Sequence, residues 1–429
     1  MLSELHLRNV GPAPAFDVEL ADRLNVFTGD NSLGKTFLLD IAWWMMTGSW
    51  AAQPILPAKA RRSDGFWLLP AIWVKDQKIT VSYSFANQVW GRQYAKLPPD
   101  YNSLVAYARV DGGFSVWDPA RNDWERREDL TDQWDFDEVR PSNYSFSPDA
   151  LWQGLESRGT VLCNGLLRDW VNWQNQPKQD ETSPFQLLSR VIAGLSHPEE
   201  AMKPGPPQRM SVIDARDVPT LELPYGRIPL INASAGIKRI VNLAYLLVWA
   251  WVEHTRAAEL RGLEPVKHLT LLIDEVESHL HPRWQRAILP SLLTISEQLQ
   301  SKLRSQILAT THAPLVLASI EPNFDPSRDK LFHFKLDGGN VRLDEVPWAK
   351  EGDAVNWLTS DVFGLAQARS REAEVAIEAA EALMRGDKAA LPAGLRTRSA
   401  IDKKLKRLLP GHDPFWPRWI VTAPKARQA

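Results

Sequence analysis

The chain has 429 residues, which allows two or three domains and a sizeable hydrophobic core. Its 44% hydrophobic and 24% charged content is ordinary for a globular protein, and the formal net charge of -2 singles out no nucleic-acid partner. A single cysteine, Cys163, excludes an internal disulfide and a cysteine-based metal site. The start of the chain is too charged for a signal peptide and the longest apolar run, 240–252, is too short to cross a bilayer, so we expect a cytoplasmic protein with no membrane partner.

The N-terminal part contains a candidate phosphate site. Alternating segments at 5–10 and 15–20 predict strands, the apolar run 24–27 predicts a short buried strand, and 37–44 predicts a helix. Between this last strand and the helix lies a match to G-x-x-x-x-G-K-[ST], the phosphate-binding loop, in the strand–loop–helix context that the motif requires. Its residues are Gly29, Asp30, Asn31, Ser32, Leu33, Gly34, Lys35 and Thr36.

The chemistry of this loop follows from its residue types. Glycines adopt φ > 0 and let the backbone approach a phosphate, while backbone N–H groups and the helix N-terminus supply positive potential. We expect Lys35 to reach the β- and γ-phosphates of a nucleotide and Thr36 to bind Mg²⁺.

The composition changes after residue 113. From 114 to 207 Trp, Pro, Asp and Asn are frequent and residues 123–138 are acidic, so we predict an insertion. Within it, apolar spacing predicts helices at 150–173 and 185–195, and the Pro-Gly-Pro-Pro sequence at 204–207 predicts a linker. We interpret most of the 19 tryptophans of the chain as packing anchors, with stacking on bases as the alternative. Before the insertion, further strands are predicted at 66–74, 78–85 and 103–110.

A second candidate phosphate site precedes a strongly apolar helix. A hairpin is predicted at 218–223 and 227–231, followed by Ser234-Ala235-Gly236-Ile237-Lys238 and a helix at 240–254. Ser234 can cap the helix, and Gly236 leaves backbone N–H groups accessible. A segment of this kind is more often a plain helix cap, so alone it does not establish a site.

A carboxylate pair ends the next predicted strand, 268–273. Asp274 and Glu275 follow a fully apolar run, where charges need a partner or a metal. We expect Asp274 to hold Mg²⁺, directly or through water, and Glu275 to orient or deprotonate an attacking water. The spacing of His279 and His281 could suit a metal, but a loop role without metal is favoured because no cysteine lies nearby.

A histidine ends the following strand, at 305–312. A lone histidine is more often structural, but the position of His312 at a strand end, just after the Asp-Glu strand, favours a catalytic role. A last hairpin is predicted at 331–336 and 341–346.

The C-terminal part, from residue 347, is predicted to be helical and basic, with helices at 371–384 and 399–409. Its basic residues lie beside the aromatic segment 415–419, and this combination favours an interface. We interpret it as a docking surface for a partner or for the rest of the chain, with nucleic acid as the alternative. The basic residues of the second helix are Lys403, Lys404, Lys406 and Arg407.

The order of these motifs resembles that of the ABC-type ATPases of the SMC, RecF and OLD group, within the AAA family. In that group the four segments are the Walker A, signature, Walker B and switch-histidine motifs. The segment 274–281 looks like the Walker B motif and D-loop of the group, and 357–365 looks like a segment of the compact OLD-like ATPases of anti-phage defence systems such as Septu and PARIS. The resemblance covers about residues 1–110 and 210–370.

The resemblance implies an α/β fold of the P-loop NTPase class, in the form of an ABC-ATPase head. The head is expected in two parts, 1–113 and 208–346, split by the Trp-rich insertion 114–207 and followed by the helical tail 347–429. The tail is too short for the Toprim nuclease of true OLD proteins, so a nuclease or toxin effector is expected to be a separate chain.

The resemblance also implies ATP and Mg²⁺ as cofactors and ATP hydrolysis as the activity, with Glu275 and His312 in catalytic roles. Two heads would sandwich ATP, with Ser234, Gly236 and Lys238 of one head closing on the nucleotide held by the other, in a homodimer or a higher oligomer. His281 stands where SMC-type proteins have the D-loop Asp, and it is counted with the nucleotide-binding residues.

The sequence departs from the family pattern at several points. The signature is not Leu-Ser-Gly-Gly-Gln, so its phosphate contact could be weaker or could use Lys238, and Val276 replaces a frequent Pro. Asp111 and Gln93 are both candidates for the Gln-loop. The leading interpretation is an ATPase that regulates a separate effector in anti-phage defence, and the alternative is a RecF-like DNA-binding ATPase of repair or replication. A pseudo-ATPase scaffold is disfavoured because all the motif residues are present, and a transporter ATPase because the insertion and tail have no place there.

Overall fold

The computed structural model describes residues 1–8, 10–13, 15–55, 62–63, 66–67, 71–73, 81–84, 89–92, 103–122, 141–177 and 179–421 of the chain. The protein divides into two compact units, Met1–Gly352 and Asp353–Ala429. The first unit contains every residue that the sequence assigns to phosphate, metal or catalysis.

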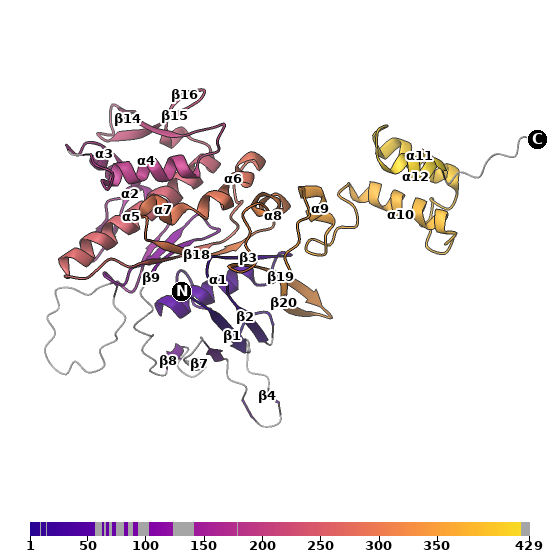
Figure 1. Cartoon of the computed structure of the whole chain (residues 1–429), viewed down its shortest axis with the longest axis horizontal. Helices are drawn as coiled ribbons and strands as arrows, with labels where there is room; N and C mark the ends of the chain where they lie inside the picture. Colours follow the sequence, from indigo (N-terminus) through magenta and orange to yellow (C-terminus); the bar gives the residue numbers. More distant parts are fainter. Residues whose placement is uncertain are drawn as a thin grey trace, which may run out of the picture. The chain divides into compact units, whose positions relative to one another are not determined.

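An eight-stranded sheet forms the centre of the first unit (Figure 1), with the order β11-β10-β9-β17-β18-β3-β19-β20. Neighbouring strands from β9 to β19 are parallel, while β10, β11 and β20 pair antiparallel at the two edges. Parallel strands covered on both faces are apolar throughout, and β17 is buried over 269–273. The strands are β3 (Leu24–Gly29), β9 (Ser103–Ala108), β10 (Phe114–Trp117), β11 (Tyr144–Phe146), β17 (His268–Ile273), β18 (Arg304–Thr310), β19 (Asp329–Asp337) and β20 (Asn340–Val346).

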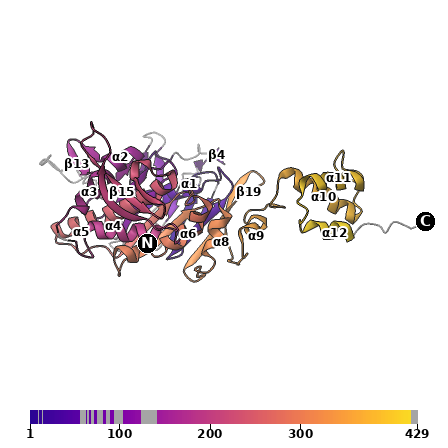
Figure 2. The same cartoon turned by 90° about the horizontal axis from the view of Figure 1, so that it is seen from above.

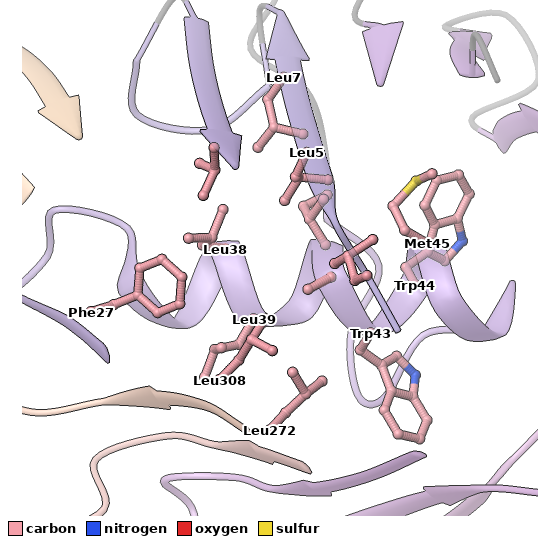
Figure 3. Packing of buried hydrophobic residues seen from close by; sticks show 14 of the residues in the cluster. Leu5, Leu7, Phe27, Leu38, Leu39, Trp43, Trp44, Met45, Leu272 and Leu308 are labelled. Atoms are coloured by element: carbon pink, nitrogen blue, oxygen red, sulfur yellow. The ribbon is translucent and has the colours of Figure 1, made fainter. Parts of the chain in front are cut away.

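One face of this sheet is covered by α1 (Lys35–Thr47) and by a small sheet of order β2-β1-β6 (Figure 1). Helix α1 is buried almost all round because it lies between the two sheets. Leu38 points toward Leu5 of β1, and Leu39 points toward Leu308 of β18 (Figure 3). The mixed α/β fold and the strand, loop and helix around 29–36 are therefore confirmed. The remaining strands on this side are β1 (Glu4–Arg8), β2 (Ala15–Glu19), β4 (Arg62–Ser63), β5 (Phe66–Trp67), β6 (Ala71–Trp73), β7 (Val81–Ser84) and β8 (Val89–Arg92).

The other face is covered by helices, with α5 (Ala235–Leu260) at their centre (Figure 1). Among the described residues, α5 is the one helix long and apolar enough to cross a membrane, but 72% of its most apolar window is buried inside the protein, as in a core helix. Beyond α5, helix α4 packs against both α5 and strand β14. The other helices of this unit are α2 (Pro148–Gln153), α3 (Leu166–Gln174), α4 (Pro184–Leu195), α6 (Pro282–Leu292), α7 (Ile295–Leu299) and α8 (Pro314–Ile320).

The helix predicted at 150–173 is wrong. This stretch contains the end of α2, a hairpin of β12 (Leu155–Ser157) and β13 (Thr160–Cys163), and most of α3. Gly154, Gly159 and Gly165 interrupt the helix with φ values of 118°, 81° and 87°. Glycine enters this backbone region at no steric cost, so the apolar periodicity of the stretch is broken into shorter elements.

The predicted insertion 114–207 contributes strands to two sheets that it shares with other parts of the first unit. Strand β10 pairs with β9, and β11 pairs with β10, so the segments 114–117 and 144–146 belong to the central sheet; the acidic run 123–138 lies outside the described residues. The predicted linker 204–207 is part of β14 (Lys203–Arg209), an edge strand, where prolines are tolerated. Its neighbours in a three-stranded sheet are β15 (Asp217–Leu223) and β16 (Gly226–Pro229), and the turn η1 (Leu230–Asn232) follows.

The end of the first unit is fastened to the helix that follows His312. The carboxylate of Glu321, directly after α8, accepts hydrogen bonds from the backbone N–H groups of Glu351 (2.9 Å) and Gly352 (3.0 Å). Nearby, the rings of Phe324 and Trp348 stack with centroids 3.6 Å apart and an interplanar angle of 6°. The chain therefore leaves the first unit from a fixed point beside α8.

The second unit has its own hydrophobic core, which gathers α10, α11 and α12 (Figure 2). The sequence predicts an interface at 415–419, but Phe415 and Trp419 are 5% and 2% exposed and pack in this core, with Arg398 over the Trp419 ring. These two aromatic side chains are therefore occupied within the unit. The helices are α9 (Ala354–Thr359), α10 (Arg371–Arg385), α11 (Arg398–Leu408) and α12 (Phe415–Val421).

Candidate functional site

The phosphate-binding loop joins β3 to α1 and depends on its two glycines. Gly29 and Gly34 have φ values of 130° and 105°. A Cβ atom at Gly29 would lie 2.4 Å from the carbonyl oxygen of Phe334, and one at Gly34 would lie 2.7 Å from Cγ of Pro12. A larger residue at either position would clash, so the turn requires glycine for its backbone angles and for its close packing.

Lys35 begins α1, and its side chain curls over the loop. Its Nζ donates hydrogen bonds to the carbonyl oxygens of Gly29 (2.8 Å) and Asp30 (2.7 Å). Burial lowers the pKa of Lys35 to about 8, although the negative charges of Asp274 and Glu275 oppose the effect. The ammonium is thus held above the loop, where it could exchange carbonyl contacts for phosphate oxygens.

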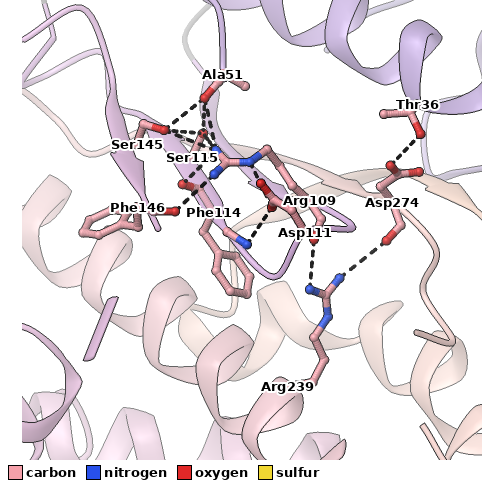
Figure 4. A network of polar contacts seen from close by, with 11 residues as sticks. Thr36, Ala51, Arg109, Asp111, Phe114, Ser115, Ser145, Phe146, Arg239 and Asp274 are labelled. Carbon is pink, nitrogen blue, oxygen red and sulfur yellow. Dashed lines mark hydrogen bonds and ion pairs between the residues drawn. The ribbon is translucent and has the colours of Figure 1, made fainter. Parts of the chain in front are cut away.

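Thr36 and Asp274 meet across 238 positions of sequence (Figure 4). Thr36 Oγ1 donates to one carboxylate oxygen of Asp274 at 2.7 Å, and Thr310 Oγ1 donates to the other at 2.7 Å. A hydroxyl and a carboxylate are hard oxygen ligands of the type that Mg²⁺ prefers, so this pair fits the ion that the resemblance implies. Within the described ranges no group of three or more His, Cys, Asp and Glu side chains is arranged to hold a metal ion by itself, so further ligands would have to come from phosphate and water.

Glu275 and His312 lie beside this pair. Glu275 has the left-handed φ of 48°, and its N–H donates to Thr310 Oγ1 at 2.7 Å, which fixes the backbone from which its side chain leaves. The Nε2 of His312 lies 3.9 Å from Oε1 of Glu275. Burial, followed by the nearby Lys35 ammonium, lowers the pKa of His312 and favours the neutral imidazole.

The structure adds Glu277, which the sequence interpretation missed. Its Oε1 accepts a hydrogen bond from the backbone N–H of His312 at 2.5 Å. Burial raises the pKa of Glu277, as expected for a carboxyl group drawn away from water. The available signal was a third acid, two residues after Glu275, with no role assigned to it.

Arg239 is a second missed residue. From the first turns of α5 it donates to the carbonyl oxygens of Arg109 (2.9 Å) and Asp274 (3.5 Å) (Figure 4). Burial lowers the pKa of Arg239. Of the two Gln-loop candidates, Asp111 accepts hydrogen bonds from Gly113 N–H (2.8 Å) and Arg109 Nε (3.3 Å), and Gln93 lies outside the described residues.

The second candidate phosphate site opens on a groove of about 860 Å³. Ser234 caps α5 and accepts a hydrogen bond from the N–H of Ile237 at 3.4 Å. A Cβ atom at Gly236 would lie 2.9 Å from the carbonyl oxygen of His279, so glycine lets the two turns pack directly together. His281 caps α6 and accepts a hydrogen bond from Arg283 N–H at 3.3 Å. The groove is lined by Glu200, Tyr225, Ser234, Ala235, Gly236, Ile237, His279, Leu280, His281, Arg283 and Trp284.

The predicted site residues therefore fall into two groups. The phosphate loop, Asp274, Glu275 and His312 form the first, and Ser234, Gly236 and His281 form the second. None of the eight loop residues, all within the described ranges, lines the groove. Lys238 is also outside the groove lining, and its Nζ donates to the carbonyl oxygen of Ile231 at 2.8 Å.

Comparison with known proteins finds a family similarity over part of the chain. Residues 226–318, from β16 to α8, match the family described as AAA domain, putative AbiEii toxin, Type IV TA system. Among solved structures, the SMC head domain from Thermotoga maritima is 13% identical with a TM-score of 0.34, covering 81% of this chain and 99% of that chain. The cbiO1 protein from Clostridium perfringens, part of the ABC transporter complex cbiONQ, is 12% identical with a TM-score of 0.33, covering 77% of this chain and 84% of that chain.

Proposed function

We propose that the protein binds and hydrolyses ATP as an ABC-type ATPase, dimerises on ATP, and regulates a separate nuclease or toxin effector in anti-phage defence. The observation that carries the proposal is the hydrogen bond of 2.7 Å between Thr36 and Asp274. It joins the phosphate loop to the strand that carries the acidic pair, with Glu275 and His312 at its side. This is the arrangement that phosphoryl transfer to water needs, because positioning and charge stabilisation make up most of its catalysis.

Each residue has a distinct task in this proposal. Lys35 and the loop N–H groups hold the phosphates, while Thr36 and Asp274 hold Mg²⁺, which supplies charge neutralisation when bound. Glu275 orients the attacking water and accepts its proton. His312, favoured as neutral imidazole, donates a hydrogen bond toward the terminal phosphate.

The proposed dimer rests on the separation of the two groups of site residues. The groove at the start of α5 exposes backbone N–H groups at the end of a 26-residue helix, a suitable contact for phosphate. Because no phosphate-loop residue lines this groove, a nucleotide on the loop of one head would meet the groove of a second head. Lys238 would join that contact after leaving the Ile231 carbonyl.

The effector and the defence role are supported by the segment 357–365 and by the toxin–antitoxin description of the matching family. The RecF-like alternative is favoured by Lys403 and Lys406, which are exposed on α11. A nuclease or toxin gene beside this one would support the effector, and replication genes would support the alternative.

Complementation between two variants tests the dimer. Ser234→Arg should keep ATP binding by the monomer and lose ATP-dependent dimerisation and hydrolysis, and mixing it with Lys35→Ala should restore at most one composite site per dimer. Ser370→Arg is a matched control, because Ser370 also caps a helix, α10, in the second unit. Size-exclusion chromatography and phosphate release measure both effects. A Ser234→Arg protein that dimerises and hydrolyses like the parent rejects the sandwich.

A further inference from the structure

The two residues proposed to act on water and phosphate stand on adjacent loops. Strands β17 and β18 are parallel neighbours in register, with Ile273 opposite Ala309, and Glu275 and His312 follow their ends. The backbone ladder continues just past the strands, through Val276 N–H to the carbonyl oxygen of Thr310 at 3.1 Å. Beyond this last backbone bond, the distance between the side chains of Glu275 and His312 depends on contacts made by the two loops.

Glu277 makes such a contact at His312 itself. Its carboxylate accepts the His312 backbone N–H at 2.5 Å, a charge-assisted hydrogen bond that is stronger than a neutral one. The bond joins positions 277 and 312, and the Nε2 of His312 lies 3.9 Å from the carboxylate of Glu275. Drawing a carboxylate away from water costs free energy unless a partner offsets it, so this bond defines where Glu277 stays.

Two backbone hydrogen bonds hold the segment that carries Glu277. Ser278 N–H donates to the Glu275 carbonyl oxygen at 2.8 Å, and Leu280 N–H donates to the Glu277 carbonyl oxygen at 2.9 Å. The His279 carbonyl oxygen of the same turn would lie 2.9 Å from a Cβ at Gly236. The segment 275–280 therefore carries Glu275, bonds the backbone of His312 through Glu277 and forms part of the groove.

We propose that Glu277 is a positioning residue for ATP hydrolysis, which acts through the backbone of His312 to hold the imidazole opposite the Glu275 carboxylate. The inference rests on the proposed ATPase activity. Glu277 makes no hydrogen bond to a phosphate-loop residue in the described contacts, and its charge is only a minor influence on the pKa of Lys35, so its main effect should fall on kcat and not on ATP affinity.

The test compares Glu277 variants of the full chain by steady-state phosphate release and by ATP binding. Glu277→Ala removes the acceptor, and Glu277→Asp keeps the charge but shortens the side chain by one methylene. Both should lower kcat by about tenfold to a hundredfold, because small displacements of reacting groups have effects of this size, with KM and ATP Kd unchanged. Glu277→Gln keeps an oxygen acceptor and should retain most of the activity. Glu297→Ala, an exposed glutamate on α7, is the matched control.

A double-mutant cycle with His312→Ala separates positioning from general destabilisation. If Glu277 acts through His312, Glu277→Ala should add little to the loss already caused by His312→Ala. Equal losses in both backgrounds, or ATP binding weakened together with kcat, would overturn the inference, and so would parental activity in Glu277→Ala. A parent protein that does not hydrolyse ATP would instead reject the proposed function. If Glu277→Ala does not fold, the Asp and Gln variants carry the same comparison.

Discussion

The phosphate loop and the groove at the start of α5 are both helix N-termini with a glycine at a close contact, yet they are built differently. In the loop, Lys35 Nζ donates to the carbonyl oxygens of Gly29 and Asp30, and Thr36 donates to Asp274, which directly follows β17. In the groove, the side chains of Ser234 and His281 each accept a hydrogen bond from a backbone N–H group of their own turn, and both residues are exposed. The first region is bonded across the fold, whereas the second has polar groups that line an open groove. Nucleotide binding should therefore be a property of the loop alone, and hydrolysis a property of both regions.

The largest effect expected from this contrast is on hydrolysis at Glu275. Glu275→Gln removes the proton acceptor and leaves the phosphate contacts, so the rate should fall by about 10²–10⁴-fold while ATP still binds and the dimer accumulates. Single-turnover phosphate release and size-exclusion chromatography with ATP measure the two outcomes. Hydrolysis by Glu275→Gln at the parental rate would show that Glu275 is not the proton acceptor.

The next largest effect is on ATP binding, where a lysine of the phosphate loop and a lysine near the groove should differ. Lys35→Ala should weaken ATP binding by about 1.5–3 kcal/mol, because a charge-assisted contact to phosphate is lost. Lys238→Ala should leave binding by the monomer unchanged, since its Nζ bonds the Ile231 carbonyl oxygen away from the loop. Calorimetric titration under conditions that keep the protein monomeric compares them. Equal losses in the two variants would contradict the division between loop and groove.

The sequence was most informative where structure is local. The strand–loop–helix around 29–36 and the capped start of α5 follow from residue types within a few positions, and both are present. The composition at 114–117 did not indicate that β10 pairs with β9, because strand pairing depends on the neighbouring strand and not on the local residue mix. Apolar spacing likewise misled at 150–173, where glycines with positive φ override it.

Long-range contacts explain the site residues that were missed. Glu277 meets His312 across 35 positions and Arg239 meets Arg109 across 130, and neither pair leaves a local pattern. The burial of Phe415 and Trp419 could not be predicted for the same reason, because an aromatic side chain suits an interface as well as the core in which these two lie.

A smaller effect is a dependence of ATP affinity on pH. Burial lowers the pKa of Lys35 to about 8 in the free protein, whereas a phosphate partner favours the charged form and raises that pKa in the complex. ATP binding then takes up a proton above about pH 8, so affinity should be constant below that pH and fall by up to tenfold per unit above it. ATP titrations of the parent and of Lys35→Ala, one pH unit below and one pH unit above pH 8, measure this dependence. The same pH dependence in Lys35→Ala would assign it to another group.

The smallest effect on ATP hydrolysis is expected from the second unit. Replacing Lys403, Lys404, Lys406 and Arg407 by Glu should leave the hydrolysis rate unchanged, since the motif residues all belong to the first unit. DNA binding at several salt concentrations and capture of the effector should be measured separately. Loss of DNA binding with effector capture unchanged would favour the RecF-like alternative over docking.

The bond between Glu321 and the backbone of Glu351 and Gly352 has a mechanical consequence. Helix α8 begins two residues after His312 and ends at Ile320, directly before Glu321, so it spans about 10 Å between the loop of His312 and the end of the first unit. Val316, Leu317 and Ile320 are buried along it, so the helix is packed into the first unit over its whole length. Helix α8 and the Glu321 hydrogen bonds therefore form one continuous connection from the loop of His312 to Gly352, the last residue of the first unit.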